Sequence, residues 1–219
     1  MTSKCERLVH GKVVSDHIVQ LFDTEASLAS SVAAYLADGF RRGDVLLMVA
    51  RPAHWRATSK RLRKLGFDVE DAVEHRRLVV LDAATTLASF MRRGSVDAEQ
   101  FEEVVGAAVR QLAATAPCLR IYGEMVDLLA EEGNLDGALH LETLWNDLAR
   151  RYSFTLLCGY ASAQFTNRET VEALKHICGA HSHLQRKSID VLGNWILRNS
   201  RLERKDPPAI RARLRLASD

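Results

Sequence analysis

Several residues that could bind a ligand lie within or directly after stretches predicted to be strands. Glu124 follows an apolar stretch and Gly123, which lets a backbone or a ligand approach closely. An acidic residue at this place is typical of nucleotide hydrolases built on a parallel sheet. Arg51 and Tyr160 follow other apolar stretches, and Gln20 lies within the first one. Because ligands of open parallel sheets bind beyond the carboxyl ends of the strands, these side chains are predicted to line one binding site.

The turn after the first predicted strand lacks what a nucleotide phosphate needs. A phosphate-binding loop, GxxxxGK followed by Ser or Thr, surrounds phosphate with bare backbone N–H groups and a lysine. Residues 22–28 read FDTEASL, without glycine or lysine and with two carboxylates that repel phosphate. Nucleotide hydrolysis is therefore not expected, although nucleotide binding without hydrolysis stays an alternative. Asp23, Thr24 and Asp82, each at the end of a predicted strand, are interpreted as helix caps rather than ligand contacts.

Histidine and cysteine gather in residues 176–183, which read HICGAHSH. If this segment is helical, Cys178 and His181 share one face, whereas His176 and His183 lie on another and about 10 Å apart along the axis. Four ligands of one metal ion cannot come from a helix arranged in this way. A metal site would need unwinding at Gly179 or outside partners such as Cys158 or His17. We therefore interpret the segment as a helix end with satisfied histidines, with a metal or redox role as the alternative.

The cysteines favour the same simple interpretation. Cys5, Cys118, Cys158 and Cys178 are widely spaced in a chain large enough to fold without crosslinks, so reduced, buried thiols are expected. A redox bridge between Cys158 and Cys178 stays open if their Cα atoms approach within about 7 Å.

Strand-length apolar runs alternate with segments of helical period, a pattern typical of a parallel sheet with crossover helices. Five strands are predicted, at residues 17–22, 44–50, 78–81, 118–122 and 154–158. The predicted helices lie between and after them, including one that starts at Pro52, a short one over 85–91, a long one from about Asp97 to before Pro117, and a last one from about Arg168. The fold class is α/β, with helices on both faces of a mainly parallel sheet.

The chain divides into an N-terminal extension (1–14), one domain (15–185) and a C-terminal amphipathic helix with a basic tail (186–219). The tail holds nine Lys/Arg and four Asp/Glu, net +5, against +2 for the whole chain. Trp195, Arg198 and Arg201 are candidate contacts to a protein partner or to a second copy. The basic residues lack interleaved aromatic side chains, which argues against nucleic acid as the partner. The first residues carry charges, and the apolar runs are no longer than a strand. Both features predict a cytoplasmic protein without a membrane segment.

Several stretches resemble one known family. They are HIVQLF at 17–22, GDVL at 43–46, YGEMV at 122–126, Gly133-Asn134, LETLWNDL at 141–148, LLCGY at 156–160 and ICGAHSH at 177–183. In this order they resemble the MEDS domain, the methanogen/methylotroph, DcmR sensory domain, over about residues 15–185. The resemblance implies a RecA-like three-layer sandwich, related to the RecA/KaiC ATPases but without their phosphate loop, that senses small, hydrocarbon-derived molecules.

Family members commonly adjoin histidine-kinase or DNA-binding helix-turn-helix domains, and residues 186–219 are too short for either. We therefore expect a stand-alone regulatory domain in signal transduction or transcriptional control, with no catalytic residue and no cofactor. The candidate ligand-binding residues are His17, Gln20, Arg51, Glu124, Asn146 and Tyr160; the candidate redox or metal residues are Cys158, Cys178, His181 and His183. The alternative is a protein-interaction or oligomerisation module with a vestigial nucleotide site.

Overall fold

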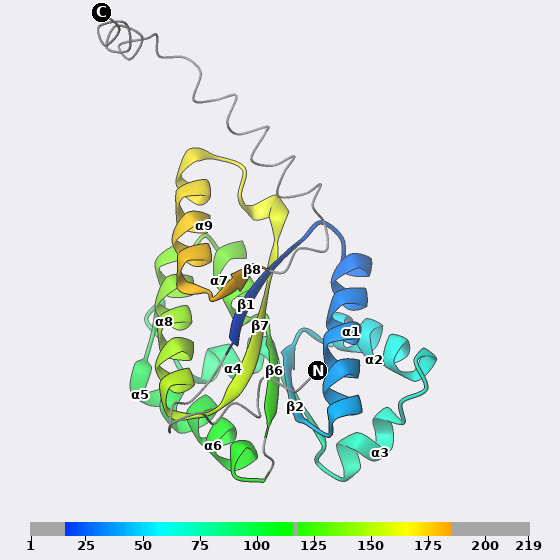
Figure 1. Cartoon of the computed structure of the whole chain (residues 1–219). Helices are drawn as coiled ribbons and strands as arrows, with labels where there is room; N and C mark the ends of the chain where they lie inside the picture. Colours follow the sequence, from blue (N-terminus) through cyan, green and yellow to red (C-terminus); the bar gives the residue numbers. More distant parts are fainter. Residues whose placement is uncertain (1–15, 116–117, 185–219) are drawn as a thin grey trace, which may run out of the picture. The chain divides into compact units, whose positions relative to one another are not determined.

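A parallel sheet forms the centre of the protein (Figure 1). The computed structural model describes residues 16–115 and 118–184. Six strands share this sheet in the order β3-β2-β6-β7-β1-β8, and all neighbouring pairs are parallel. The strands are β1 (Asp16–Phe22), β2 (Val45–Ala50), β3 (Leu78–Asp82), β6 (Leu119–Gly123), β7 (Phe154–Ala161) and β8 (His183–Leu184). The five predicted strands are confirmed, and β8 is a short sixth strand that the sequence did not reveal.

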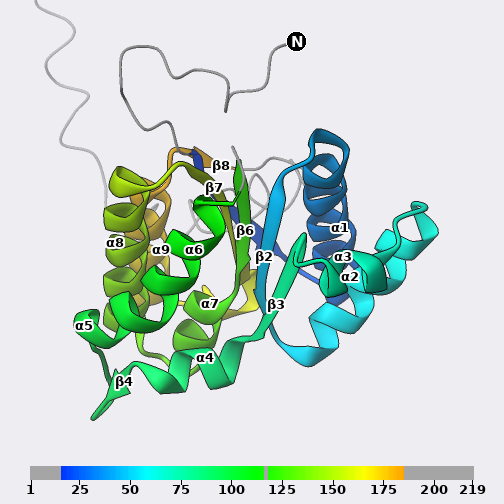
Figure 2. The same ribbon diagram turned by 90° about the horizontal axis from the view of Figure 1, so that it is seen from below.

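Two layers of helices enclose the sheet (Figures 1 and 2). One face is covered by α1 (Glu25–Arg42), α2 (Pro52–Lys64) and α3 (Val69–Glu74). The opposite face is covered by α6 (Ala107–Ala113), α8 (Leu135–Arg151) and α9 (Arg168–Ala180). The remaining helical segments are α4 (Ala83–Ser89), α5 (Ala98–Phe101), η2 (Glu102–Gly106), α7 (Met125–Glu131) and η3 (Ser162–Gln164). The predicted three-layer α/β sandwich is confirmed.

Strand β2 is apolar along its whole length because both faces of the sheet are covered. In β2, which reads VLLMVA, residues 46–50 are at most 2% exposed. Strands buried on both faces lose the alternation of apolar and polar residues that marks a half-exposed strand. This is why an apolar run of strand length was a reliable signal in this chain.

The ends of the helices follow from capping residues. The hydroxyl of Thr24 accepts from the backbone N–H of Ser27 at the start of α1, and Asp82 accepts from that of Thr85 at the start of α4. Gly43 ends α1 with a left-handed φ of 74°. The interpretation of Thr24 and Asp82 as caps is thus confirmed.

Two helical predictions need correction. The predicted helix over 85–91 ends at Ser89, and Met91–Arg92 (β4) pairs with Ser95–Val96 (β5) in a hairpin. The two turn residues, Arg93 and Gly94, have φ of 51° and 81°, as a two-residue hairpin turn requires. The predicted long helix from Asp97 is interrupted by a π-helical stretch, η2, between α5 and α6.

The cysteines do not all behave as expected. Cys158 and Cys178 are free, as predicted, and no bridge joins them. Cys118 is disulfide-bonded. The expectation of four reduced thiols is therefore wrong at Cys118.

Among the described helices, none combines the length and the apolar character that a membrane span requires.

Candidate functional site

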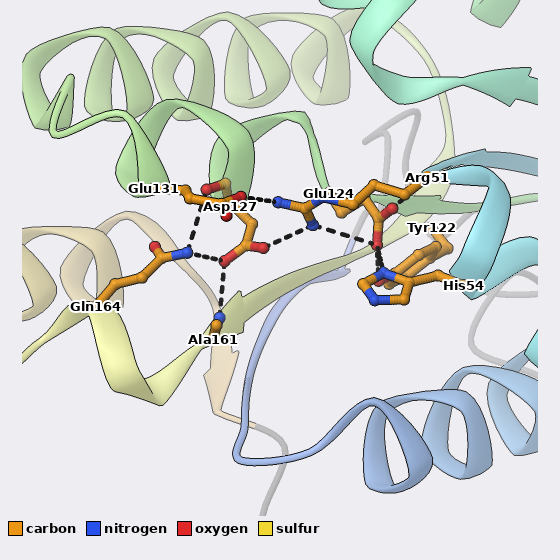
Figure 3. A network of polar contacts seen from close by, with 8 residues as sticks. All are labelled: Arg51, His54, Tyr122, Glu124, Asp127, Glu131, Ala161 and Gln164. Atoms are coloured by element: carbon orange, nitrogen blue, oxygen red, sulfur yellow. Dashed lines mark hydrogen bonds and ion pairs between the residues drawn. The ribbon is translucent and has the colours of Figure 1, made fainter.

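A network of charged side chains lies where β2 and β6 end (Figure 3). These strands are neighbours, but α2 follows β2 on one face of the sheet, whereas α8 lies on the other face, between β6 and β7 in sequence. The junction is therefore a topological switch point, where parallel sheets bind ligands. Arg51 follows β2 and Glu124 follows β6, so these two predicted residues meet there. We call the residues drawn in Figure 3 the strand-end network: Arg51, His54, Tyr122, Glu124, Asp127, Glu131, Ala161 and Gln164.

Glu124 is fully buried at the centre of this network. Its carboxylate accepts a hydrogen bond from the backbone N–H of Arg51. His54 Nδ1 lies 2.6 Å from Glu124 Oε2, and the hydroxyl of Tyr122 donates to the same oxygen at 2.9 Å. The backbone N–H of Glu124 donates to the carbonyl of Val49 at 3.2 Å, which fixes the residue against β2.

The guanidinium of Arg51 joins three carboxylates. Its Nη1 lies 2.8 Å from Asp127 Oδ2 and 3.9 Å from Glu124 Oε2, and its Nη2 lies 2.8 Å from Glu131 Oε2. Asp127 and Glu131 are one turn apart on α7, so one arginine can bridge both. The other oxygen of Asp127 accepts from the backbone N–H of Ala161 at 2.7 Å, which ties α7 to the end of β7.

Burial and hydrogen bonding shift the titration of these groups. Burial raises the pKa of Asp127 even though the N–H of Ala161 and Arg51 oppose the shift. The hydrogen bond with Glu124 raises the pKa of His54 against the effect of burial. Burial, and then the charge of Glu124, holds the pKa of Tyr122 well above its usual 10.0. The network carries three carboxylates against one arginine and one histidine, a charge balance that disfavours an anionic ligand.

The turn between β1 and α1 offers no phosphate site either. The backbone N–H of Thr24 donates to the hydroxyl of Ser27, and Thr24 Oγ1 accepts from the N–H of Ser27 at 3.1 Å. In a phosphate loop the N–H groups at this helix start point at the anion. Asp23 accepts a hydrogen bond from the hydroxyl of Ser162 and adds a negative charge beside the turn.

A second polar group is buried between the sheet and α8. Its centre is Glu142 of α8, which is 0% exposed. His17 Nε2 lies 3.1 Å from Glu142 Oε2, Cys158 Sγ donates to the same oxygen at 3.6 Å, and His181 Nε2 lies 3.4 Å from Oε1. The ligand-type atoms of these four residues all lie within 4.8 Å of one another. We call His17, Glu142, Cys158 and His181 the Glu142 cluster.

The strands bring this cluster together through their alternation. His17 of β1 pairs in register with Leu156 of β7, and Val19 pairs with Cys158, so the side chains of His17 and Cys158 project from neighbouring strands onto the α8 face. Tyr160 extends the same row, and its hydroxyl donates to Glu142 Oε1 at 2.7 Å. 

Three further contacts orient the histidines. Asn146, one turn after Glu142, places its Oδ1 2.9 Å from His17 Nδ1 and donates from Nδ2 to the carbonyl of Ala180 at 3.0 Å. His181 Nδ1 lies 2.6 Å from the carbonyl of Ile177.

The charges in the cluster are strongly coupled. Burial alone would raise the pKa of Glu142, but His181 and His17 lower it well below its usual range. Burial, and then the charge of Glu142, holds the pKa of the Cys158 thiol well above its usual 9.0. Glu142 is therefore an ionised carboxylate beside a protonated thiol.

The six predicted ligand-binding residues do not share one site. Arg51 and Glu124 belong to the strand-end network, whereas His17, Asn146 and Tyr160 surround Glu142. Gln20 is buried between Ile18 and Phe22, which both pack in the core cluster with α1, so strand alternation places it on the opposite face from His17. The prediction of one site for all of them is wrong because alternate residues of a strand face opposite layers.

The predicted metal and redox residues also separate. Cys158 and His181 belong to the Glu142 cluster, but Cys178 contributes only its backbone carbonyl, which accepts from the N–H of His181. His183 pairs through its backbone with Ile18, and its side chain lies outside the described residues. Because α9 ends at Ala180, His181 is not helical, and its Nε2 is buried without a hydrogen-bond partner among the described residues. The expected helix end therefore falls at Ala180, but the expectation of satisfied histidines does not hold for Nε2 of His181.

Three important residues were not predicted from the sequence: Glu142, His54 and Asp127. Glu142 stands between Ala138 and Trp145 in the buried stripe of α8, and a carboxylate inside an apolar stripe was the available signal. Asp127 is buried one turn after Glu124, at the start of a predicted helix. The predicted partner contacts Trp195, Arg198 and Arg201 lie outside the described residues and stay predictions.

Comparison with solved structures shows the same architecture. An uncharacterised protein from Pyrococcus horikoshii, determined in complex with an unknown peptide, is 15% identical, with 77% of this chain and 76% of that chain covered and a TM-score of 0.55. A KaiC-like protein from Pyrococcus horikoshii OT3 is 16% identical, with 80% and 75% covered and a TM-score of 0.49. The match with a TM-score of 0.55 shows that the α/β fold is shared. No curated protein matches this chain.

One family model covers strands β1 to β7 together with the strand-end network and the Glu142 cluster. The family model of the methanogen/methylotroph, DcmR sensory domain matches residues 16–181. This range runs from the first residue of β1 to His181. The chain therefore belongs to the MEDS family of sensory domains.

Proposed function

We propose that the chain is a non-catalytic regulatory domain that senses a small, uncharged polar molecule at the strand-end network, in signal transduction or transcriptional control. Its family is one of sensory domains, which supports a regulatory role. The observation that carries the proposal is Arg51, whose guanidinium lies at the switch point between β2 and β6, holds three carboxylates and is 21% exposed. A charged group that is held in place by its partners and is still accessible to solvent is suited to binding a ligand.

The state of the polar groups supports binding rather than catalysis. Both oxygens of Glu124 are engaged, by the N–H of Arg51, by His54 and by Tyr122. A general base needs a free lone pair within reach of the proton that it abstracts, and a nucleophile needs an activating base. In the strand-end network each acidic group is already held by donors inside the protein, so the network positions a ligand without attacking it.

One unsatisfied atom indicates the ligand chemistry. Gln164 donates from Nε2 to Asp127 Oδ1 at 2.9 Å, and its Oε1 is buried without a hydrogen-bond partner among the described residues. A buried acceptor without a partner costs about 1–3 kcal/mol, which a ligand donor would offset. A small molecule with a hydroxyl or amide N–H can donate to this acceptor, whereas the carboxylates of Asp127 and Glu131 would repel a phosphate.

Thermal unfolding tests this proposal. We expect members of a panel of small alcohols and primary amides to raise the Tm of the protein by several degrees at saturation, because a ligand at about 100 times its Kd adds about 2.7 kcal/mol. ATP and GTP should leave the Tm unchanged. Gln164→Leu should abolish the shift, whereas Arg63→Ala, which removes an exposed ion pair with Glu70 on α2 and α3, should keep it. Equal shifts in the wild type and in Gln164→Leu, or a shift with ATP alone, would contradict the proposal.

A further inference from the structure

We propose that the Glu142 cluster binds one divalent transition-metal ion, Zn²⁺ or an ion of similar preference, through His17, Glu142, Cys158 and His181. This site is separate from the strand-end network and does not depend on the sensing role proposed above. Two imidazoles, a thiolate and a carboxylate form the kind of mixed ligand set that suits Zn²⁺.

The distances between the four side chains support a tetrahedral site. With metal–ligand bonds of about 2.0–2.3 Å, the ligand atoms of a tetrahedron are about 3.3–3.6 Å apart. His17 Nε2 lies 3.3 Å from Cys158 Sγ and 3.1 Å from Glu142 Oε2, and Cys158 Sγ lies 3.6 Å from that same oxygen. His181 Nε2 lies 3.4 Å from Glu142 Oε1. Because the ligand atoms of all four residues lie within 4.8 Å of one another, small shifts of the side chains would bring them to the spacing that a bound ion imposes.

The outer contacts orient the histidines as metal ligands. Asn146 donates from Nδ2 to the carbonyl of Ala180, so its Oδ1 faces His17 Nδ1 and accepts a hydrogen bond from it. The carbonyl of Ile177 likewise accepts a hydrogen bond from His181 Nδ1. In a neutral imidazole with its proton on Nδ1, the lone pair is on Nε2, and both Nε2 atoms point into the cluster. Partners of this type on the far ring nitrogen are typical of metal-binding histidines.

Without a cation, the single Glu142 carboxylate faces both histidines, and its charge is balanced only when one of them is protonated. If both histidines are neutral, their Nε2 lone pairs face a carboxylate oxygen at 3.1 and 3.4 Å. If both are protonated, two imidazolium rings with centroids 4.0 Å apart share one buried carboxylate. A divalent ion resolves both problems, because its two positive charges balance the Glu142 carboxylate and a Cys158 thiolate. Among the described residues His181 Nε2 accepts and donates no hydrogen bond, although it lies 3.4 Å from Glu142 Oε1, and a bound ion would give this buried atom a direct bond.

The bound ion would act as a clamp. Metal binding forms a bond to Cys158 Sγ and releases the thiol proton to solvent, without any change of oxidation state. Four protein ligands fill a tetrahedral ion and leave no open position for substrate, so the site is structural rather than catalytic. It would tie β1, α8 and β7 to His181, the first residue after α9. Ser182 follows directly and donates from its backbone N–H to the carbonyl of His17 at 2.8 Å, so metal occupancy would control how firmly this part of the chain is held on β1.

Cobalt titration of the reduced full-length protein tests the site. Co²⁺ is a spectroscopic probe for zinc sites, and a bound thiolate gives an intense charge-transfer band in the near ultraviolet. We expect one equivalent of Co²⁺ to produce this band together with the strong visible absorption of a tetrahedral ion, and one equivalent of Zn²⁺ to displace it. Cys158→Ser should lose the charge-transfer band, and Cys178→Ser is the matched control because Cys178 is free and outside the cluster.

A third variant distinguishes the site from accidental binding. Asn146→Ala keeps all four ligands but removes the group that orients His17, and it should weaken Co²⁺ binding by about 10–100-fold while keeping the band. Circular dichroism checks that each variant is folded. Absence of the band in the folded, reduced wild type, or its persistence in Cys158→Ser, would overturn the proposal. Neither result affects the alcohol and amide shifts at the strand-end network, so the two proposals fail separately.

Discussion

Arg51 lies at the centre of the charge balance in the strand-end network. Its side chain holds Asp127, which is almost fully buried, and it contacts Glu124, which is fully buried. Removing one partner of a buried ion pair leaves the other charge without compensation. We expect Arg51→Ala to lower the free energy of unfolding by about 3 kcal/mol, as measured by urea denaturation. Arg63→Ala should keep nearly wild-type stability because both partners of that ion pair are exposed, and similar losses in the two variants would contradict this interpretation.

His54 should make stability depend on pH. Its hydrogen bond with Glu124 raises the folded-state pKa above the usual 6.5. A group with a raised pKa contributes stability that is fully present below 6.5 and is lost as the pH rises through the folded-state pKa. Urea unfolding of the wild type and of His54→Gln across this window should therefore show a stability difference that shrinks as the pH rises. The pKa of His181 is also raised, but His181 titrates in both proteins and cancels from the difference; a constant difference would argue against the role of His54.

At the residue scale, the sequence identified candidate residues better than it grouped them. Arg51 and Glu124 meet because parallel strands end at one edge, a rule that needs no coordinates. The Glu142 cluster instead depends on residues 17, 142, 158 and 181, which come together only through strand register and through the exact end of α9. Residues 176–183 contribute only His181, which lies just beyond the end of α9, and the other members come from β1, α8 and β7.

At the scale of the elements, two helical glycines, Gly39 and Gly179, differ in the space that surrounds them. A Cβ added at Gly39 of α1 would lie 2.6 Å from the Leu46 side chain of β2, which is fully buried, and 3.0 Å from Arg120. A Cβ added at Gly179 of α9 meets no atom within 4 Å.

The same substitution should therefore have opposite effects in the two helices. Gly179→Ala should stabilise the protein by about 0.5–1 kcal/mol through helix propensity. Gly39→Ala should destabilise it by about 1 kcal/mol, because overpacking costs about 1–3 kcal/mol and exceeds that gain. Thermal unfolding measures both changes, and equal signs would show that packing does not limit the approach of α1 to the sheet.

The elements predicted correctly are those with a strong pattern of their own. The five long strands are rich in apolar residues, and α1 is marked by a capping residue at one end and a left-handed glycine at the other. β8 pairs only through Ile18 and Val19, and two residues carry no periodic signal. The β4–β5 hairpin depends on the positive φ of Arg93, which its residue type does not indicate. Short elements are therefore set by tertiary contacts more than by their own residues.

For the whole molecule, the order β3-β2-β6-β7-β1-β8 decides where the two proposed sites lie. The reversal between β2 and β6 opens the switch point occupied by the strand-end network. β1 and β7, further along the sheet, carry the Glu142 cluster on the α8 face. Because Ala161 at the end of β7 donates to Asp127, and Tyr160 beside it donates to Glu142, two consecutive residues connect both sites.

The pairing of β8 with β1 also has a consequence for how the domain can be joined to other proteins. Ile18 and Val19 pair with His183 and Leu184, so the first and last described strands are neighbours. With strands about 4.8 Å apart and about 3.3 Å per residue, Asp16 and Leu184 lie about 11 Å from each other. A short peptide could bridge that gap, which makes this fold a good candidate for circular permutation or for insertion as a cassette into a loop of a host protein.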